Sequence, residues 1–350
     1  MSHSKRRMFH DCSEYGGSRW SKSRLLESGG SRMSLLSVKN LKKYYSAGLI
    51  KKHYSVKALD GVSFDIEPGE LFGVIGESGC GKTTLGLVLS RLERETSGEI
   101  TFKGLKLSGT LKLDSDTRRQ IQIIFQNPYE SFDPRLRIEQ SLLLPMRINR
   151  ICDNDAERRE KILGYMKDAG FEPPDAFLNR YPHELSGGQL QRISIIRAML
   201  LKPTFLVADE CVSMLDLSVR ASVVNLLLDL VEREKTTVLF ITHDLSLAGH
   251  VCDRIMVLYL GKTVELSTAK RIVESPLHPY TRILMSYSPS IFKKREKISV
   301  KKLDVETAIG SGCVFAPRCP YSFEKCAQQM PPLIEIEPSH SVACWLYSRT

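Results

Sequence analysis

Residues 76–83, with the sequence GESGCGKT, constrain the fold of this chain more than any other feature. They fit the pattern G-x-x-x-x-G-K-[ST] and lie between a strand pattern at 71–75 and a helical pattern that continues to about residue 91. The glycines free the backbone, so its amides and the positive end of the following helix can surround phosphate oxygens. The segment therefore predicts a site for the phosphates of a nucleotide.

Two side chains of this loop are suited to the ligand's charge. The ammonium group of Lys82 is expected to meet the terminal phosphates, and the hydroxyl of Thr83 is expected to bind Mg²⁺. The predicted nucleotide-binding residues of the segment are Gly76, Ser78, Gly79, Cys80, Gly81, Lys82, Thr83 and Thr84.

The patterns on either side of the loop predict an α/β fold. Short strand-like runs from 35 to 64 are typical of an antiparallel sheet, and residues from about 127 to 200 are mostly helical by pattern. From 205 to 258 strands and helices alternate, which favours a largely parallel sheet. We therefore expect a phosphate-loop nucleoside triphosphatase core with an antiparallel β subdomain and a helical subdomain.

Charge and hydropathy narrow the class of protein. The formal net charge is +10, but residues 1–32 hold seven basic and three acidic residues, so the remainder carries about +6. This mildly basic body is a weak argument for a nucleic-acid partner. No run approaches the roughly 18 apolar residues of a membrane span. We expect residues 1–32 to be a disordered basic tail, unless translation begins at Met33.

Residues 205–210, with the sequence FLVADE, indicate a buried strand that runs into two carboxylates. Because side chains alternate along a strand, Asp209 and Glu210 should point in different directions. One can then join the Mg²⁺ shell while the other polarises a water aimed at the γ-phosphate. Such a pair alone is more often a solvated turn, but the upstream phosphate loop favours Asp209 as a Mg²⁺ ligand and Glu210 as the catalytic base.

Residues 185–189, LSGGQ, precede a strongly helical run. Ser186 and the amides of Gly187 and Gly188 can open this helix as a second anion site, although the same letters fit an ordinary helix cap. With the two preceding motifs, the segment resembles the signature motif of the ATP-binding cassette superfamily. The resemblance covers roughly residues 34–350 and implies that Ser186, Gly187, Gly188 and Gln189 bind the ATP held by a partner subunit.

The resemblance assigns further roles by position. Tyr45 is similar to the aromatic residue that stacks on adenine, and neighbouring Tyr44 is the alternative. Gln126 resembles the glutamine that contacts Mg²⁺ and the attacking water. Asp216 ends a loop similar to the one that crosses to the partner, and His243 resembles the histidine that senses the γ-phosphate.

Cys211 departs from the family pattern, which usually has proline after the catalytic glutamate. Proline would fix φ at this position, so its loss could loosen the loop that holds Glu210. The change removes no ligand, and we therefore still expect hydrolysis.

Three segments resemble the dipeptide and oligopeptide importers, namely GESGC at 76–80, VSMLD at 212–216 and SPLHPYT at 275–281. The cysteine in the phosphate loop is more similar to the second of their two unlike ATPase subunits. The resemblance implies a heterodimer with a paralogous ATPase, two integral membrane permease subunits and an extracellular solute-binding protein. It also implies a peripheral location at the cytoplasmic face of the membrane. It favours dipeptides or oligopeptides as the solute, with nickel complexes or oligosaccharides as the alternatives.

Two other functions compete with this interpretation. Soluble cassette ATPases that act on ribosomes or nucleic acid commonly fuse two cassettes or carry long coiled insertions, and neither feature appears here, so we expect no nucleic-acid partner. A regulatory subunit with little catalysis is the third possibility, for which Cys211 is the only argument.

Four of the nine cysteines crowd into the last forty residues. They are Cys313, Cys319, Cys326 and Cys344, within an expected C-terminal extension at 271–350 that follows an ATPase domain at 33–270. Zinc sites usually contain tight C-x2-4-C pairs, which are absent, while iron–sulfur clusters tolerate wider spacing. The pattern resembles the [4Fe–4S] site of importer ATPases. Zinc, and cysteines that are reduced or disulfide-bonded, remain the alternatives.

Overall fold

The computed structural model describes residues 34–47, 54–287 and 311–348, so the predicted tail at 1–32 lies outside the described residues. The strands are β1 (Leu36–Ala47), β2 (Tyr54–Ile66), β3 (Leu71–Ile75), β4 (Ser97–Phe102), β5 (Leu105–Lys106), β6 (Ile121–Ile124), β7 (Phe205–Asp209), β8 (Thr237–Thr242), β9 (Arg254–Tyr259), β10 (Lys262–Thr268), β11 (Ile334–Glu337) and β12 (His340–Val342). The helices are α2 (Lys82–Leu89), α3 (Ser115–Gln120), α4 (Ile138–Ile148), α5 (Asp155–Asp168), α6 (Pro174–Leu178), α7 (Gly187–Met199), α8 (Leu217–Glu234), α9 (Leu245–Val251), α10 (Ala269–Glu274), α11 (Pro279–Tyr287) and α12 (Glu324–Gln328), with 3-10 turns η1 (Pro128–Ser131) and η2 (Pro182–Glu184).

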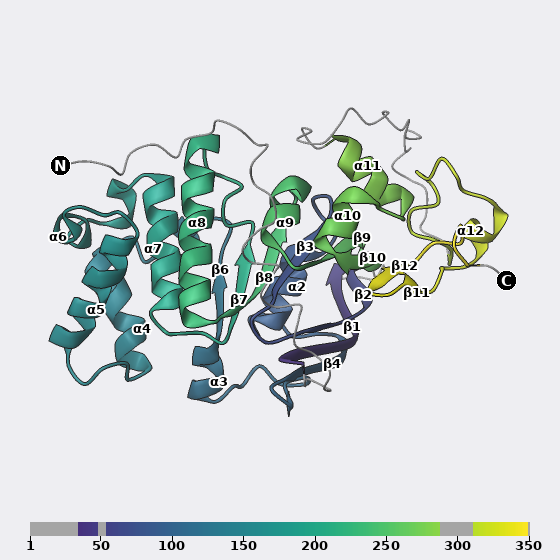
Figure 1. The fold of residues 1–350 in the computed structure, drawn as a ribbon. Helices are drawn as coiled ribbons and strands as arrows, with labels where there is room; N and C mark the ends of the chain where they lie inside the picture. Colours follow the sequence, from purple (N-terminus) through teal and green to yellow (C-terminus); the bar gives the residue numbers. More distant parts are fainter. Residues whose placement is uncertain (1–33, 48–53, 288–310, 349–350) are drawn as a thin grey trace. The chain divides into compact units, whose positions relative to one another are not determined.

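These strands form two sheets (Figure 1). A four-stranded antiparallel sheet has the order β2-β1-β4-β5, and an eight-stranded sheet has the order β11-β12-β10-β9-β3-β8-β7-β6. The pairs from β9 through β3, β8 and β7 to β6 are parallel. The predicted combination of an antiparallel sheet with a largely parallel core is therefore present.

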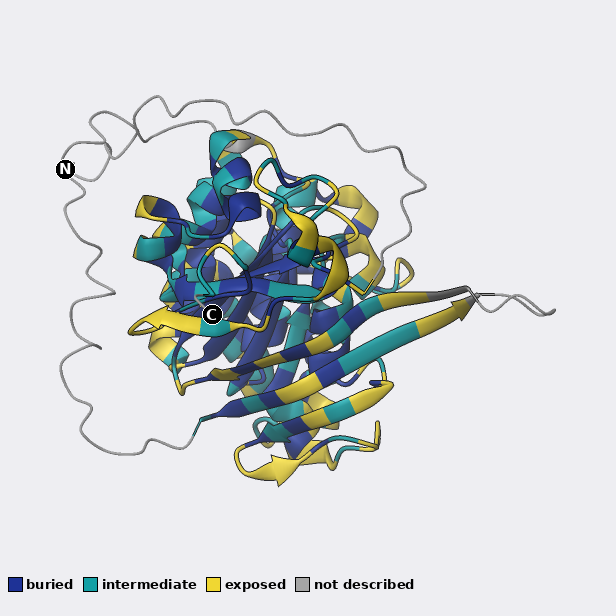
Figure 2. Cartoon of the chain, turned by 90° about the vertical axis from the view of Figure 1, so that its right-hand side faces the viewer, coloured by how far each residue is buried: buried dark blue, intermediate teal, exposed yellow. Residues whose placement is uncertain are grey.

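Neighbouring residues of each parallel strand enter different hydrophobic clusters. In β3, Leu71 and Ile75 belong to the cluster that includes residues of α8 and α9. Phe72 and Val74 belong to the cluster that includes residues of α2 and the small sheet. Figure 2 shows the resulting band of buried residues along the central strands. Burial on both faces explains why these strands are continuous apolar runs in the sequence.

The helices from α4 to α7 lie beyond β6, at one edge of the large sheet (Figure 1). Helix α7 joins them to the core because it contacts β6, α8 and η1. Its first turn is fixed by a capping box, in which Ser186 Oγ accepts from the Gln189 amide and Gln189 Oε1 accepts from the Ser186 amide. In the part of the chain that is described, no helix has both the length and the apolarity needed to cross a bilayer.

The C-terminal segment continues the opposite edge of the same sheet. Strand β12 pairs with β10, and β11 pairs with β12, both in antiparallel fashion. These strands were not predicted, because β12 has only three residues and β11 is largely exposed, so neither carries a clear hydrophobic pattern.

A buried carboxylate ties this segment to the core. Glu265 in β10 accepts hydrogen bonds from the amides of Leu277 (2.7 Å) and His278 (2.9 Å) and from His340 Nε2 (2.8 Å). The side chains of Glu265 and His340 are 0% and 1% exposed. Burial lowers the pKa of His278 to about 4, and its Nδ1 accepts from the amide of Tyr280. The carboxylate thus holds together three segments that are distant in the sequence.

We expect Glu265→Ala to lower the free energy of unfolding by about 2 to 4 kcal/mol, because a buried amide, a partly buried amide and a buried imidazole lose their acceptor. Urea denaturation followed by circular dichroism measures the loss. The matched control is Glu337→Ala, since that carboxylate is 57% exposed and pairs with Arg271 at the surface. The control should change stability by no more than about 0.5 kcal/mol. Equal effects for the two variants would contradict the role assigned to Glu265.

Candidate active site

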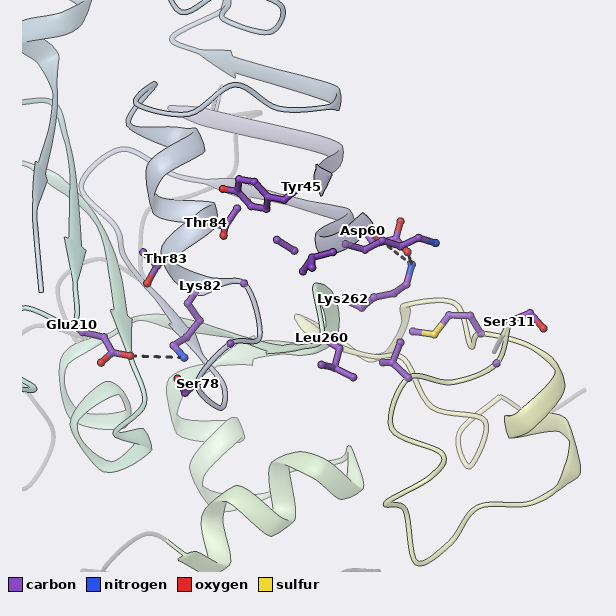
Figure 3. A pocket seen from close by; sticks show the side chains of 18 of the residues that line it. Tyr45, Asp60, Ser78, Lys82, Thr83, Thr84, Glu210, Leu260, Lys262 and Ser311 are labelled. Atoms are coloured by element: carbon purple, nitrogen blue, oxygen red, sulfur yellow. Dashed lines mark hydrogen bonds and ion pairs between the residues drawn. The ribbon is translucent and has the colours of Figure 1, made fainter. Parts of the chain in front are cut away.

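A cavity of about 870 Å³ opens at the carboxyl ends of the parallel strands (Figure 3). It is lined by Tyr45, Val56, Lys57, Ala58, Asp60, Ser78, Gly79, Gly81, Lys82, Thr83, Thr84, Gln126, Glu210, Leu260, Lys262, Ser311, Gly312, Val314 and Met330. Most of the predicted phosphate loop therefore faces one cavity together with two residues from the predicted catalytic group. The volume is in the range typical of small-molecule sites.

The phosphate loop joins the end of β3 to the start of α2. Lys82 Nζ lies inside the loop, where it donates to the carbonyl oxygens of Gly76 (2.8 Å) and Glu77 (3.0 Å). Gly81 has a φ of 107°, and a Cβ there would lie 2.2 Å from the carbonyl oxygen of Ala58. Both its backbone conformation and this close approach require glycine at position 81.

The two carboxylates at the end of β7 occupy different environments. Asp209 is 2% exposed and accepts a hydrogen bond from Thr83 Oγ1 (3.4 Å). Burial raises the pKa of Asp209 to about 6, against the opposing Thr83 hydrogen bond and with a further increase from the charge of Glu210. Glu210 has a φ of 43°, so the chain leaves the strand direction there and its amide donates to the carbonyl oxygen of Ile241 (2.9 Å). The predicted difference in direction thus arises from a left-handed backbone as well as from strand alternation.

Three side chains converge on the Glu210 carboxylate. Lys82 Nζ lies 3.8 Å from Oε1 (Figure 3), and Gln126 Nε2 donates to Oε2 (3.2 Å). His243 Nδ1 lies 3.2 Å from the same Oε2. Gln126 also reaches Ser213 Oγ (3.4 Å), at the start of the loop that leads to α8. The structure therefore brings the predicted catalytic residues Glu210, Gln126 and His243 together beside the phosphate loop.

The residues present fit a Mg²⁺ ion bound with a triphosphate. Thr83 Oγ1 lies 3.4 Å from the buried Asp209 Oδ1, so a hydroxyl and a carboxylate oxygen lie together, and Gln126 lines the same cavity as Thr83. Mg²⁺ usually takes only one or two protein oxygens and completes its shell with waters and substrate phosphates. A buried carboxylate whose charge is poorly neutralised is suited to a hard cation.

The structure distinguishes the two candidate tyrosines. Tyr45 lines the cavity with a side chain that is 37% exposed. Tyr44 is not among the lining residues, and its hydroxyl donates to Asp60 Oδ1. This arrangement favours Tyr45 as the residue available to a base.

The signature residues lie apart from this cavity. Ser186 is exposed at the start of α7, and none of Ser186, Gly187, Gly188 and Gln189 lines the cavity of the described chain. Asp216 is exposed at the N-cap of α8, next to Met214, which is 62% exposed. One described chain thus presents the two predicted halves of an ATP site at different places.

Cys211 follows Glu210 directly in the sequence and is buried. Its exposure is 2%, and burial raises the pKa of its thiol to about 12. The thiol therefore stays neutral and apolar in this position, and it contributes no ligand to the cavity.

The four C-terminal cysteines gather in one region of the fold. Burial raises the pKa of Cys344 to about 11, and the charges of Cys313, Cys319 and Cys326 act in the same direction. Within the described residues, however, no group of three or more His, Cys, Asp or Glu side chains is arranged to hold a metal ion. The thiols are neighbours, but the structure does not assemble them into the predicted ligand set.

Sequence reasoning missed two parts of the cavity wall. Asp60 and Lys262 form an ion pair (2.9 Å) at the side opposite Glu210 (Figure 3). Beyond them the wall is closed by Ser311, Gly312, Val314 and Met330. The ion pair gave no signal, because single charged residues on strands usually face solvent.

The fold and this site define an ATPase of the ATP-binding cassette class. Residues 59–213 match the family model described as ABC transporter, and residues 264–326 match the model for the C-terminal region of oligopeptide/dipeptide transporters. The chain belongs to the ABC transporter family, in the oligopeptide/dipeptide branch.

Individual relatives agree with this assignment. The putative oligopeptide transport ATP-binding protein YkfD of Bacillus subtilis is 45% identical over 322 residues, which cover 90% of this chain and 96% of that protein. The dipeptide transport ATP-binding protein DppF of Haemophilus influenzae is 44% identical over 89% of this chain and 96% of its own length. A dimeric, post-hydrolysis structure of the ATP-binding cassette MJ0796 bound to ADP and Pi is 31% identical, covers 67% of this chain and 99% of its own, and has a TM-score of 0.59.

We expect Asp209→Asn to stabilise the protein in the absence of nucleotide. Because burial raises the folded-state pKa of Asp209 to about 6, above the ~3.9 of an unfolded chain, stability falls as pH rises from about 4 to about 6 and the deficit persists at pH 7. Asn removes this cost, so the free energy of unfolding at pH 7 should rise by about 1 to 3 kcal/mol, and the gain should vanish near pH 4.

Urea denaturation of both proteins at several pH values between 4 and 7 measures this gain. Asp155→Asn is the matched control, because hydrogen bonds from Arg147 and Arg158 lower the pKa of that exposed carboxyl to about 2. At pH 7 the control substitution should lower the free energy of unfolding, whereas Asp209→Asn should raise it. A pH-independent gain for Asp209→Asn would contradict the proposed origin of the effect.

Proposed function

We propose that this chain is the ATP-hydrolysing subunit of an importer for dipeptides or oligopeptides, and that it works as a dimer with a paralogous subunit. The observation that carries the proposal is the separation of the two predicted ATP-binding elements. Lys82 and Glu210 line the cavity, whereas Ser186 is exposed elsewhere on the surface. A second subunit placed head to tail can bring its own serine–glycine turn to this cavity and so complete the site. The relative of known structure described as dimeric supports such an arrangement.

In this proposal the chain's own residues divide the work of phosphoryl transfer. Lys82 neutralises the terminal phosphates. Thr83 and Asp209 would hold Mg²⁺, which would offset the charge that develops on the phosphate oxygens. Glu210 accepts a proton from the attacking water and is held in place by Gln126 and His243. The amides at the start of α7 of the partner bind the same γ-phosphate from the other side.

Transport is driven by the loss of the γ-phosphate that the two subunits share. ATP joins two subunits because each triphosphate contacts a phosphate loop and the opposing signature turn. Hydrolysis removes the bridging γ-phosphate, so the dimer opens. Gln126 lies between the catalytic glutamate and η1, at the edge of the helical region, so it is placed to pass this motion to the permease subunits.

The partners are two integral membrane permease subunits and an extracellular solute-binding protein, with this chain peripheral at the cytoplasmic face. The names of the relatives as peptide and dipeptide transport proteins support this set, and they do not favour an ATPase that acts on ribosomes or nucleic acid. Affinity purification of the chain from its own cells should recover membrane subunits and a second cassette ATPase. Recovery of ribosomes or nucleic acid in their place would overturn the proposal.

We expect Glu210→Gln to bind ATP with nearly the original affinity while turnover falls by about 10²- to 10⁴-fold, because the amide cannot accept the proton of the attacking water. Equilibrium nucleotide binding and phosphate release, measured on the assembled ATPase pair, separate the two effects. The matched control is Glu160→Gln, which changes an exposed glutamate on α5. Undiminished hydrolysis in Glu210→Gln would refute the catalytic role.

We also propose that Cys313, Cys319, Cys326 and Cys344 bind a [4Fe–4S] cluster. The support is that the four cysteines gather in one region, although the described residues do not form a completed ligand set. Protein purified without oxygen should contain iron and acid-labile sulfide, and Cys319→Ser should lose both while Cys152→Ser retains them. Zinc without sulfide, or neither metal, would refute the cluster.

A further inference from the structure

All three polar parts of Glu77, the second residue of the phosphate loop, are engaged. Its carbonyl oxygen accepts from Lys82 Nζ (3.0 Å), and its amide donates to the hydroxyl of Tyr280 (2.8 Å). Its carboxylate accepts two hydrogen bonds from Arg318, at 2.7 and 3.0 Å. Two of these contacts come from the C-terminal part of the chain, more than two hundred residues away in the sequence.

The Arg318 guanidinium is itself held in a fixed position. It lies 5.8 Å from the ring centre of Tyr259 and 5.9 Å from that of Phe315, and its side chain is 19% exposed. Tyr259 and Tyr280 pack against Phe315, so one aromatic cluster supports both residues that contact Glu77. A forked contact on an aromatic support is stronger and more directional than an ordinary surface ion pair.

Arg318 belongs to the same compact segment as the neighbouring cysteines. It immediately precedes Cys319, whose amide donates to the carbonyl oxygen of Phe315 (3.0 Å), and the amide of Cys313 donates to the carbonyl oxygen of Cys326 (2.7 Å). The backbone of Arg318 is therefore fixed by the same contacts that hold these cysteines. Neither Glu77 nor Arg318 lines the cavity, so the pair acts on the loop from outside the site.

We propose that Arg318 is a positioning residue for nucleotide binding, which holds the phosphate loop through Glu77 and couples the cysteine segment at 313–326 to the occupancy of the ATP site. A loop that is already ordered loses less entropy when it binds a ligand, so the contact increases affinity without touching the nucleotide. Because coupling between two sites is reciprocal, nucleotide binding should in turn order the cysteine segment. The inference rests on ATP binding at this loop, as in the proposed function.

The first test is a double-mutant cycle on the full chain, with ATP affinity as the readout. We expect Arg318→Met and Glu77→Gln each to weaken ATP binding by about three- to tenfold, and the double variant to be no weaker than either single one. Arg318→Lys keeps the positive charge but loses the paired hydrogen bonds to Glu77, so its affinity for ATP should lie between those of the original protein and Arg318→Met. The matched control Arg159→Met breaks a pair with Glu139 in the helical region and should leave affinity unchanged.

The second test follows amide hydrogen exchange in residues 315–326, a stretch without residues that line the cavity. ATP should slow exchange there in the original protein and should have little effect in Arg318→Met at saturating ATP. Unchanged affinity in Arg318→Met, additive effects in the cycle, or equal slowing in both proteins would each overturn the proposal. ATP binding by the original protein is measured in the same experiments, so failure of the nucleotide site itself would be seen separately.

Discussion

The parallel pairing of β3, β8 and β7 is the constraint on which the rest of the site depends. It aligns Ile75 with Thr242 and Ile241 with Asp209, so three strands end at one edge. The phosphate loop, the Asp209–Glu210 pair and His243 each lie where one of these strands ends. Their side chains can then meet, with Lys82 and His243 on opposite oxygens of Glu210, although these two residues are 161 positions apart in the sequence. Burial of the strands on both faces fixes this register, because a shift of one residue would exchange the two hydrophobic clusters.

The parts of this arrangement that sequence predicted are those with a strong local pattern. The loop at 76–83 is marked by its glycines, and the strand before Asp209 is marked by its apolar residues. That the two segments lie close together follows from the topology of a parallel sheet. The rest depends on contacts that no local pattern encodes. Neither the left-handed backbone of Glu210 nor the forked contact between Arg318 and Glu77 has a local signature, because both depend on distant segments. The short strand β12 also becomes a strand only through β10.

The described C-terminal residues 311–348 are bound to the cassette by buried contacts, unlike a separately folded domain that is merely attached. Glu265 joins β10 to His340 in the buried interior, and Arg318 and Tyr280 join the same region to the phosphate loop. The segment also supplies Ser311 and Met330 to the cavity wall. Residues that follow the cassette in sequence are therefore part of its sheet, its active-site wall and the support of its loop.

The nucleotide site is therefore shaped from two sides by two separate sets of contacts. The γ-phosphate side is completed by a partner subunit in the proposed mechanism, since Ser186 lies away from the chain's own cavity. The outer side of the phosphate loop is held within the chain, through Glu77 and the aromatic cluster that supports Arg318. The contact with the partner subunit is made and lost in each catalytic cycle, because hydrolysis removes the γ-phosphate. The contact between Arg318 and Glu77 changes only when the C-terminal segment changes its packing. It can therefore set the affinity for ATP without taking part in hydrolysis.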